Sequence, residues 1–101
     1  GVDDQSFRIL LSHDPSHWDA KVLEKSNPPQ LTLSGHTHGF QMGIGTPAIR
    51  FSPFQFIYDQ WAGLYQKNNV AIYVNRGLGT VGYPGRIGIW PEITQITLRK
   101  K

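Results

Sequence analysis

A strand–helix–strand pattern in the first third of the chain constrains the fold more than any other feature. Residues 7–12 and 31–34 are short apolar runs typical of strands, and we expect the first to be buried on both faces for most of its length. Residues 15–25 predict a helix between them, because Asp14 provides an N-cap and apolar side chains recur on one face. This order predicts parallel strands in an α/β fold.

The rest of the chain predicts further strands around a long aromatic segment. Residues 70–75, 86–90 and 93–98 have the apolar or alternating patterns of strands. Residues 40–69 are expected to form a loop or loose hairpin, with a short helix near residues 59–65. The aromatic rings of this segment either line a cleft, form a satellite cluster beneath the loop or stay exposed and drive association.

The charge pattern argues against nucleic acid as a partner. The chain carries ten Lys and Arg against seven Asp and Glu, which gives a formal net charge of +3. Arg99, Lys100 and Lys101 account for this excess, so a frayed basic tail explains the charge better than a binding stripe does. The absence of cysteine excludes a disulfide scaffold, a Cys-ligated zinc site and a thiol nucleophile.

The ends of the chain leave the localisation open. No apolar run approaches the ~18 residues of a membrane-spanning helix. The chain begins at Gly1 rather than Met, and we expect it to be a piece of a longer bacterial protein. Any signal peptide or anchor would precede Gly1, so the cytoplasm, a membrane and export are all open.

Three of the four histidines follow predicted strand ends. His13 comes directly after the first strand, and His36 and His38 follow the second. The carboxyl ends of parallel strands meet at one edge of a sheet, where α/β proteins bind ligands. Imidazoles that converge there predict a metal site. His17, one turn into the predicted helix, is interpreted as a surface or capping residue.

Four short segments carry a family resemblance. They are LLSHDP at residues 10–15, LSGHTHG at residues 33–39, YVNRGLG at residues 73–79 and PEI at residues 91–93. Together, in this order, they resemble the C-terminal part of a calcineurin-like metallophosphoesterase of the bacterial YkuE-type phosphodiesterase branch. Four matched segments are far more specific than a single His-x-His motif.

The resemblance implies a fold and a metal centre. The family fold is a four-layer α/β/β/α sandwich with two metal ions at the sheet edge, and residues 1–101 would be the C-terminal fragment of this single domain. By the family pattern, His13 and His36 bind the second metal and His38 binds the first. The two divalent ions, Mn, Fe or Zn, activate water for phosphoester hydrolysis in the full-length enzyme.

The resemblance also implies a missing part. The family motifs D-x-H, G-D-x-x-D and G-N-H, which supply the remaining ligands, are absent from this chain. We therefore expect the chain to be inactive by itself and to need the N-terminal half of the domain as a partner. Apolar surface that packs against the N-terminal half in the full domain would be exposed in the fragment, so we expect the fragment to dimerise.

Arg76 is the candidate residue for binding a phosphorylated substrate. It lies in a Gly-rich turn after a predicted strand, where a guanidinium suits bidentate contact with phosphate. The alternative is a surface Arg that pairs with a carboxylate.

Two other functions are alternatives to the enzyme. A non-catalytic, cupin-like metal-binding barrel also uses His-x-His, but it needs a Glu three or four residues later, where this chain has Gln41 and Met42. A degenerate phosphoesterase-like domain would serve as a binding module. The three histidines retained at the expected ligand positions argue against such decay.

Overall fold

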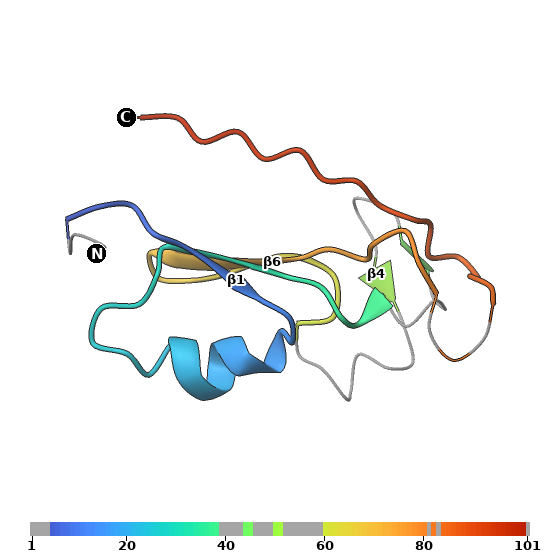
Figure 1. The fold of residues 1–101 in the computed structure, drawn as a ribbon, viewed down its shortest axis with the longest axis horizontal. Coiled ribbons are helices and arrows are strands. Elements are labelled where there is room, and N and C mark those ends of the chain that lie inside the picture. Colours follow the sequence, from blue (N-terminus) through green and yellow to red (C-terminus); the bar gives the residue numbers. More distant parts are fainter. Residues whose placement is uncertain are drawn as a thin grey trace.

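The centre of the structure is a mixed sheet in which three parallel strands lie side by side (Figure 1). The computed structural model describes residues 5–38, 44–45, 50–51, 60–80, 82 and 84–100. Within these residues the strand order is β1-β2-β6-β5, and β5 runs antiparallel to β6. The strands are β1 (Ile9–Ser12), β2 (Leu31–Ser34), β5 (Gly63–Lys67) and β6 (Val70–Val74). The predicted parallel strand–helix–strand unit and the α/β class are confirmed.

One short helix covers one face of this sheet (Figure 1). It contains the π-helix η1 (Trp18–Val22). Its two end residues, Trp18 and Val22, are almost fully buried against Ile72 and Val74 of β6. Burial of each such side chain is worth roughly 1.5–3 kcal/mol, so this apolar contact fixes the helix on the sheet. A parallel sheet with its crossover helix also contradicts the cupin-like barrel.

The helix begins where the sequence predicts it and ends before the predicted residue 25. The Asp14 carboxylate accepts a hydrogen bond from the Ser16 N–H at 2.9 Å, which satisfies a donor of the first turn. The last turn closes with a wide hydrogen bond from the Leu23 N–H to the Trp18 carbonyl at 3.0 Å. This wide turn departs from the α-helical ladder, so the helix stops near residue 22 instead of residue 25.

Strand β1 lies at the sheet edge and is not buried on both faces as predicted. Ile9 and Leu11 are 46% and 77% exposed, whereas Leu10 packs against the helix-side core. Successive side chains of a strand point to opposite faces, and among the described residues the helix covers only one of them. The apolar run therefore belongs to a strand whose second face is uncovered.

The end of the aromatic segment is a hairpin rather than a helix. The short helix predicted near residues 59–65 is wrong where the structure describes it, because β5 pairs with β6 there. Asn68 and Asn69 form the connection, and Asn68 has a φ of 53°. Asn tolerates this left-handed conformation, which two-residue hairpin turns require.

The middle of the aromatic segment contains a second pair of strands. β3 (Ile44–Gly45) and β4 (Arg50–Phe51) pair antiparallel, which confirms the predicted loose hairpin. The rings of Phe40, Phe54, Phe56 and Tyr58 lie outside the described residues, so their packing stays a prediction.

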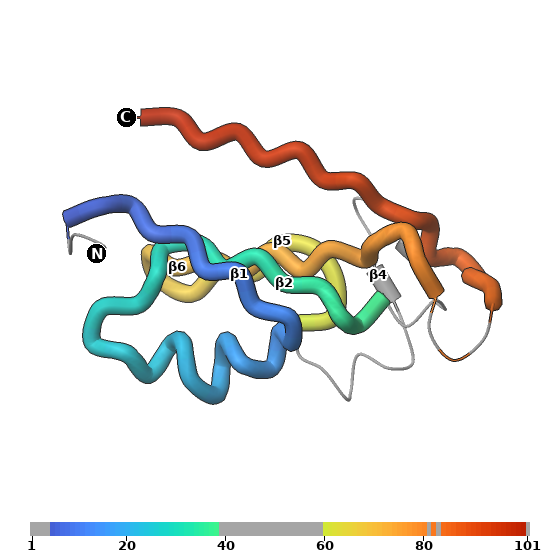
Figure 2. The backbone as a smooth tube through the Cα atoms, in the orientation of Figure 1, coloured from blue at the N-terminus to red at the C-terminus, as the bar shows by residue number. Residues whose placement is uncertain are grey.

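The C-terminal segment has a single bridge residue, Ile87, and forms no strand in the part of the chain that the structure describes. The strand predicted over residues 86–90 is reduced to a bridge at Ile87, and the strand predicted over residues 93–98 is wrong. Figures 1 and 2 show the last residues running back past the sheet at a distance from it. Ile93 is 86% exposed. The alternating pattern of residues 93–98 favours extended backbone, but among the described residues no neighbouring strand supplies the hydrogen-bonding partners that a ladder needs.

Candidate metal centre

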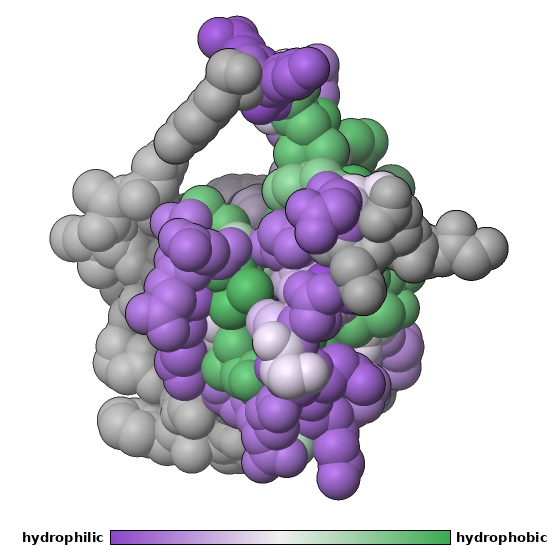
Figure 3. All heavy atoms as spheres, turned by 90° about the vertical axis from the view of Figure 1, so that its left-hand side faces the viewer, coloured by the Kyte–Doolittle hydropathy of each residue, from purple (hydrophilic) through white to green (hydrophobic). Residues whose placement is uncertain are grey.

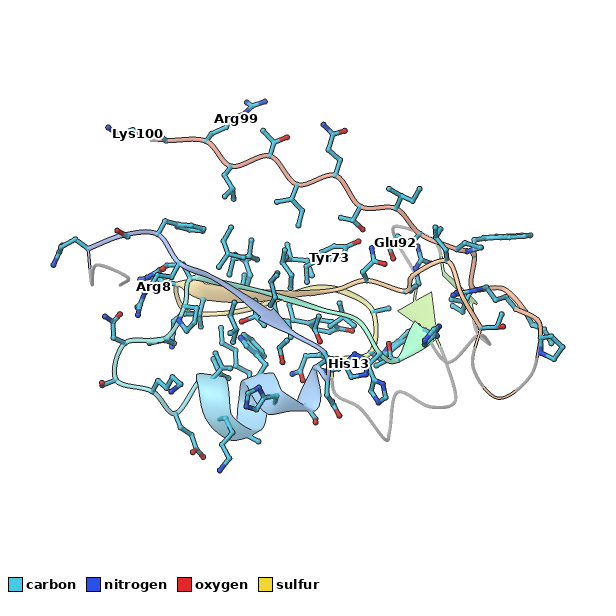
Figure 4. The ribbon with its side chains drawn as sticks, in the orientation of Figure 1. Arg8, His13, Tyr73, Glu92, Arg99 and Lys100 are labelled. Atoms are coloured by element: carbon cyan, nitrogen blue, oxygen red, sulfur yellow. The ribbon has the colours of Figure 1, made fainter. Side chains whose placement is uncertain are left out.

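The carboxyl edge of the sheet brings the predicted ligands to one place. The register aligns Ser12, Ser34 and Val74, which are the last residues of the three parallel strands. His13 follows the first of these strands, and the segment 35–38 follows the second. Figure 4 shows His13 at this end of the sheet. The prediction that all three histidines follow strand ends at one edge is confirmed, which is where α/β folds place ligand sites.

His13 and His36 form a pair of exposed imidazoles. Their ring centroids lie 4.5 Å apart and the rings are tilted by 51°. The backbone holds the pair, because the His13 carbonyl accepts hydrogen bonds from the Gly35 N–H at 3.3 Å and the Ser34 hydroxyl at 2.9 Å. Two imidazoles at this separation can direct ring nitrogens toward a shared ion.

Asp14 adds a negative charge beside this pair. Its pKa is lowered, first by the hydrogen bond from the Ser16 hydroxyl, against the opposing effect of burial. The backbone N–H of Ser16 and the nearby His36 and His13 lower the pKa further. The carboxylate is therefore ionised near the paired imidazoles.

The loop that carries the second and third histidines has an unusual backbone. His36 and His38 have φ values of 67° and 52°, in the left-handed region that non-glycine residues seldom occupy. Thr37 between them is buried, and its hydroxyl donates to the Trp61 carbonyl at 2.7 Å. The Thr37 anchor holds both histidines in a conformation of the kind that functional sites often retain.

His38 has a ring nitrogen that lacks a partner. Its side chain is half-buried, and Nδ1 is buried without a hydrogen bond among the described residues. A buried polar atom in this state is costly unless something binds it. The ring lies beside the loop after β6, since a Cβ added at Gly79 would be 3.7 Å from His38 Cε1. An imidazole with an unused nitrogen fits a metal ion of the first transition row.

The histidines do not form one three-residue cluster. In the described ranges, no group of three His, Cys, Asp or Glu side chains is close enough together to hold a single ion. The rings of His13 and His36 therefore form a pair that does not include His38. His17 is exposed and its Nδ1 lies 3.3 Å from the Ser12 hydroxyl, which fits its interpretation as a surface residue.

Arg76 pairs with a carboxylate that the sequence did not single out. Its Nε lies 2.7 Å from Oε2 of Glu92, and its backbone N–H donates to the same oxygen at 3.2 Å. The alternative interpretation, an Arg paired with an acid, therefore describes part of what Arg76 does. A role in substrate binding stays a prediction.

Glu92 is the centre of a polar network beside the site. Its carboxylate accepts hydrogen bonds from the hydroxyls of Tyr73 and Thr94 as well as from Arg76. Figure 4 shows Tyr73 and Glu92 on the same side of the sheet. Burial raises the pKa of Glu92, but these hydrogen bonds outweigh burial and lower it to about 2. Sequence reasoning noted PEI only as a family segment, because its partners are distant in sequence.

Several known proteins are similar in sequence to this chain. It is 42% identical over 100 residues to the metallophosphoesterase YkuE of Bacillus subtilis, covering 97% of this chain and 33% of the relative. It is 33% identical over 94 residues to the phosphodiesterase YaeI of Escherichia coli, covering 90% and 32%. A transmembrane protein with a metallophosphoesterase domain from Danio rerio is 36% identical over 94 residues, covering 91% and 20%. No family model and no solved structure matches the chain.

The similarity covers only part of each relative's length. The chain spans about a third of the length of the bacterial relatives, and the matched third is their C-terminal part. The resemblance drawn from the four segments is thereby confirmed. Among the described residues, no helix is long and apolar enough to cross a membrane.

Proposed function

We propose that this chain, a homologue of the C-terminal part of metallophosphoesterases over nearly all of its length, is the C-terminal fragment of one such domain. The longer protein is called the parent enzyme below. Among the described residues, a helix covers one face of the sheet, while large apolar side chains on the other face stay exposed, which supports this proposal because a four-layer sandwich would place further layers on that face. In the parent enzyme, residues 1–101 supply only part of the active centre.

The parent enzyme hydrolyses phosphoester bonds at a two-metal centre. His13 and His36 hold one divalent ion and His38 holds the other. The observation that carries this proposal is the arrangement itself: the rings of His13 and His36 lie 4.5 Å apart, and His38, whose Nδ1 has no hydrogen-bond partner among the described residues, forms no common cluster with them there. Three histidines around one ion would form a single cluster instead.

The chemistry follows from the residues present. Divalent ions, when bound, lower the pKa of coordinated water and offset charge on a phosphoryl group. This chain contributes neutral ligands to those ions, and Arg76 binds an oxygen of the phosphorylated substrate. Neutral imidazoles alone leave the charge of two dications uncompensated, so carboxylate ligands must come from elsewhere in the parent enzyme. Mn, Fe and Zn all suit such a mixed set of ligands.

The remainder of the domain covers apolar surface that is exposed here. On the uncovered face, Leu11 and Leu64 are 77% and 55% exposed, and the register places both in one row across the sheet. An open groove beside the two ends of the chain is lined by Phe7, Leu98, Arg99 and Lys100. Figure 3 shows hydrophobic atoms at this end, beneath the hydrophilic tip of the C-terminal segment. A fragment with this surface uncovered associates with itself.

Hydrolysis assays test the proposed function. The parent enzyme and the isolated 101-residue chain are each assayed with bis-p-nitrophenyl phosphate, with Mn²⁺ and after chelation. We expect metal-dependent turnover by the parent enzyme and none by the chain, which should sediment as a dimer or larger species. A parent enzyme that binds phosphate esters but never cleaves them would instead support the degenerate binding module. Efficient turnover by the chain alone would refute the fragment assignment.

A further inference from the structure

Arg86 connects the two loops that surround His38. Its guanidinium is half-buried, and Nη1 donates to the His38 carbonyl at 3.3 Å. On the other side, Nη2 donates to the Arg76 carbonyl at 2.9 Å and to the Gly77 carbonyl at 3.3 Å, and Nε donates to the Gly79 carbonyl at 3.2 Å. Arg86 thus joins the loop after β2 to the loop after β6.

The acceptors of Arg86 explain why this position needs a guanidinium. Among the described residues, its hydrogen-bond acceptors are backbone carbonyls, and it pairs with no carboxylate. A guanidinium offers five donors in a rigid plane and can reach carbonyls on both sides at once. A lysine ammonium offers its donors from one point on a flexible stem. The contacts therefore select Arg for its geometry rather than for its charge alone.

The same segment is anchored in the interior near the histidine loop. Ile89, three residues after Arg86, is 1% exposed and forms an apolar cluster with Trp61 and Ala62. The Trp61 carbonyl accepts the hydroxyl of Thr37, the residue next to His38. The Arg86 segment and the histidine loop are therefore fixed to the same buried cluster.

This arrangement restrains His38 from several sides. Its carbonyl is bound by Arg86, its backbone is left-handed, and the loop after β6 lies next to its ring. A left-handed residue without such restraints relaxes readily toward ordinary backbone angles, which would turn the ring away. We propose that Arg86 is a positioning residue that holds the backbone of His38, and the adjacent loop 76–79, in the geometry needed to bind a divalent metal ion. This inference rests on the proposed metal-binding role of His38.

Arg8 offers a matched control at the other end of the sheet. Its Nη2 also donates to backbone carbonyls, those of Asn27 at 3.0 Å and Pro28 at 3.2 Å. Figure 4 shows Arg8 and His13 at opposite ends of β1. Arg8→Gln therefore removes a similar backbone contact without touching the proposed site.

The test compares Arg86→Gln, Arg86→Lys and Arg8→Gln in the parent enzyme. Mn²⁺ affinity is measured by calorimetry, and amide hydrogen exchange of the metal-free protein is measured for residues 35–38 and 76–79. We expect both Arg86 variants to lose about tenfold or more in Mn²⁺ affinity, the scale at which residues that orient ligands act. Both should also speed exchange in the two loops. Arg8→Gln should leave affinity and loop exchange as in the unmodified enzyme.

The outcomes separate this inference from the proposed function. Unchanged loop exchange in both Arg86 variants would overturn the positioning role. Faster exchange with unchanged Mn²⁺ affinity would overturn the link between Arg86 and the metal. If the unmodified parent enzyme binds no Mn²⁺, the proposed metal centre fails, and with it the claim that Arg86 serves a metal ligand. If Arg86→Gln does not fold, Arg86→Lys carries the comparison, because it keeps the charge and the aliphatic stem.

Discussion

Arg76 and Glu92 form an ion pair at the carboxyl edge of the sheet, with Nε 2.7 Å from Oε2. The side chains are 23% and 10% exposed, so the pair is more shielded from solvent than an ordinary surface ion pair. Within the described residues, Nη1 and Nη2 of Arg76 make no hydrogen bond. The pair with Glu92 and a contact with phosphate therefore use different donors, and Glu92 would orient the guanidinium for the substrate.

Replacing Arg76 with Ala should impair the reaction without removing metal. A charge-assisted hydrogen bond is worth about 1.5–3 kcal/mol, so kcat/KM should fall roughly 10- to 100-fold. Steady-state kinetics of the parent enzyme, together with metal analysis of the same samples, measure this effect. Glu92→Gln removes the ion pair but keeps the Arg76 guanidinium, so it is the control and should lower kcat/KM less. An unchanged kcat/KM for Arg76→Ala would leave the residue with only a structural role.

Glu92 should make stability depend on pH in the acid range. Its folded-state pKa of about 2 is below the ordinary value of 4.5, so the folded protein favours the ionised form. The resulting stabilisation is complete above about pH 4.5 and is lost as the pH falls toward 2, by up to about 3 kcal/mol. Urea denaturation of the metal-free parent enzyme between pH 2 and 6 measures it. Glu92→Gln should remove this part of the pH dependence; equal slopes for both proteins would contradict the assignment.

The hydroxyl of Thr37 should stabilise the histidine loop. It is buried and donates to the Trp61 carbonyl at 2.7 Å, so Thr37→Val leaves that acceptor without this partner. We expect a loss of about 1–3 kcal/mol in the free energy of unfolding, together with weaker metal binding, because the left-handed residues on both sides lose their anchor. Thermal and urea denaturation check the first effect. Thr37→Ser keeps the hydroxyl and should retain most of both properties.

The sequence was sufficient to predict which residues gather at the sheet edge, because strand ends follow directly from local apolar patterns. The placement of His13, His36 and His38 after β1 and β2 needed no long-range information. The left-handed backbone of the histidine loop was not predictable, because it depends on Thr37 reaching Trp61, 24 residues away in the chain. Glu92 was missed as a polar centre for the same reason.

The errors in strand and helix assignment have a common physical cause. Residues 93–98 alternate as a strand does, yet a ladder also requires a neighbour, and the described residues provide none there. The sequence predicts a short helix near residues 59–65, yet Gly63 has a φ of 88° and begins β5. In both cases the partner strand, rather than the local pattern, decides the structure.

Removing single histidines gives the most direct test of the metal centre. Asn is the suitable replacement at His36 and His38, because it tolerates their φ values of 67° and 52° and removes the imidazole. In the parent enzyme each change should reduce bound metal and lower kcat by about 100-fold or more, since a lost ligand cannot be replaced by a group already in the site. Metal analysis after dialysis and steady-state hydrolysis measure both effects.

His17 provides the control for these variants. It lies in the helix next to the site, but its ring contacts the Ser12 hydroxyl and is exposed. His17→Asn should therefore retain the metal content and activity of the unmodified enzyme. A two-ion centre further predicts that His13→Asn and His36→Asn each reduce metal content by about one ion and share one phenotype, because their rings lie 4.5 Å apart and serve the same ion. Full metal content in the Asn variants of His13, His36 and His38 would show that these histidines are not ligands.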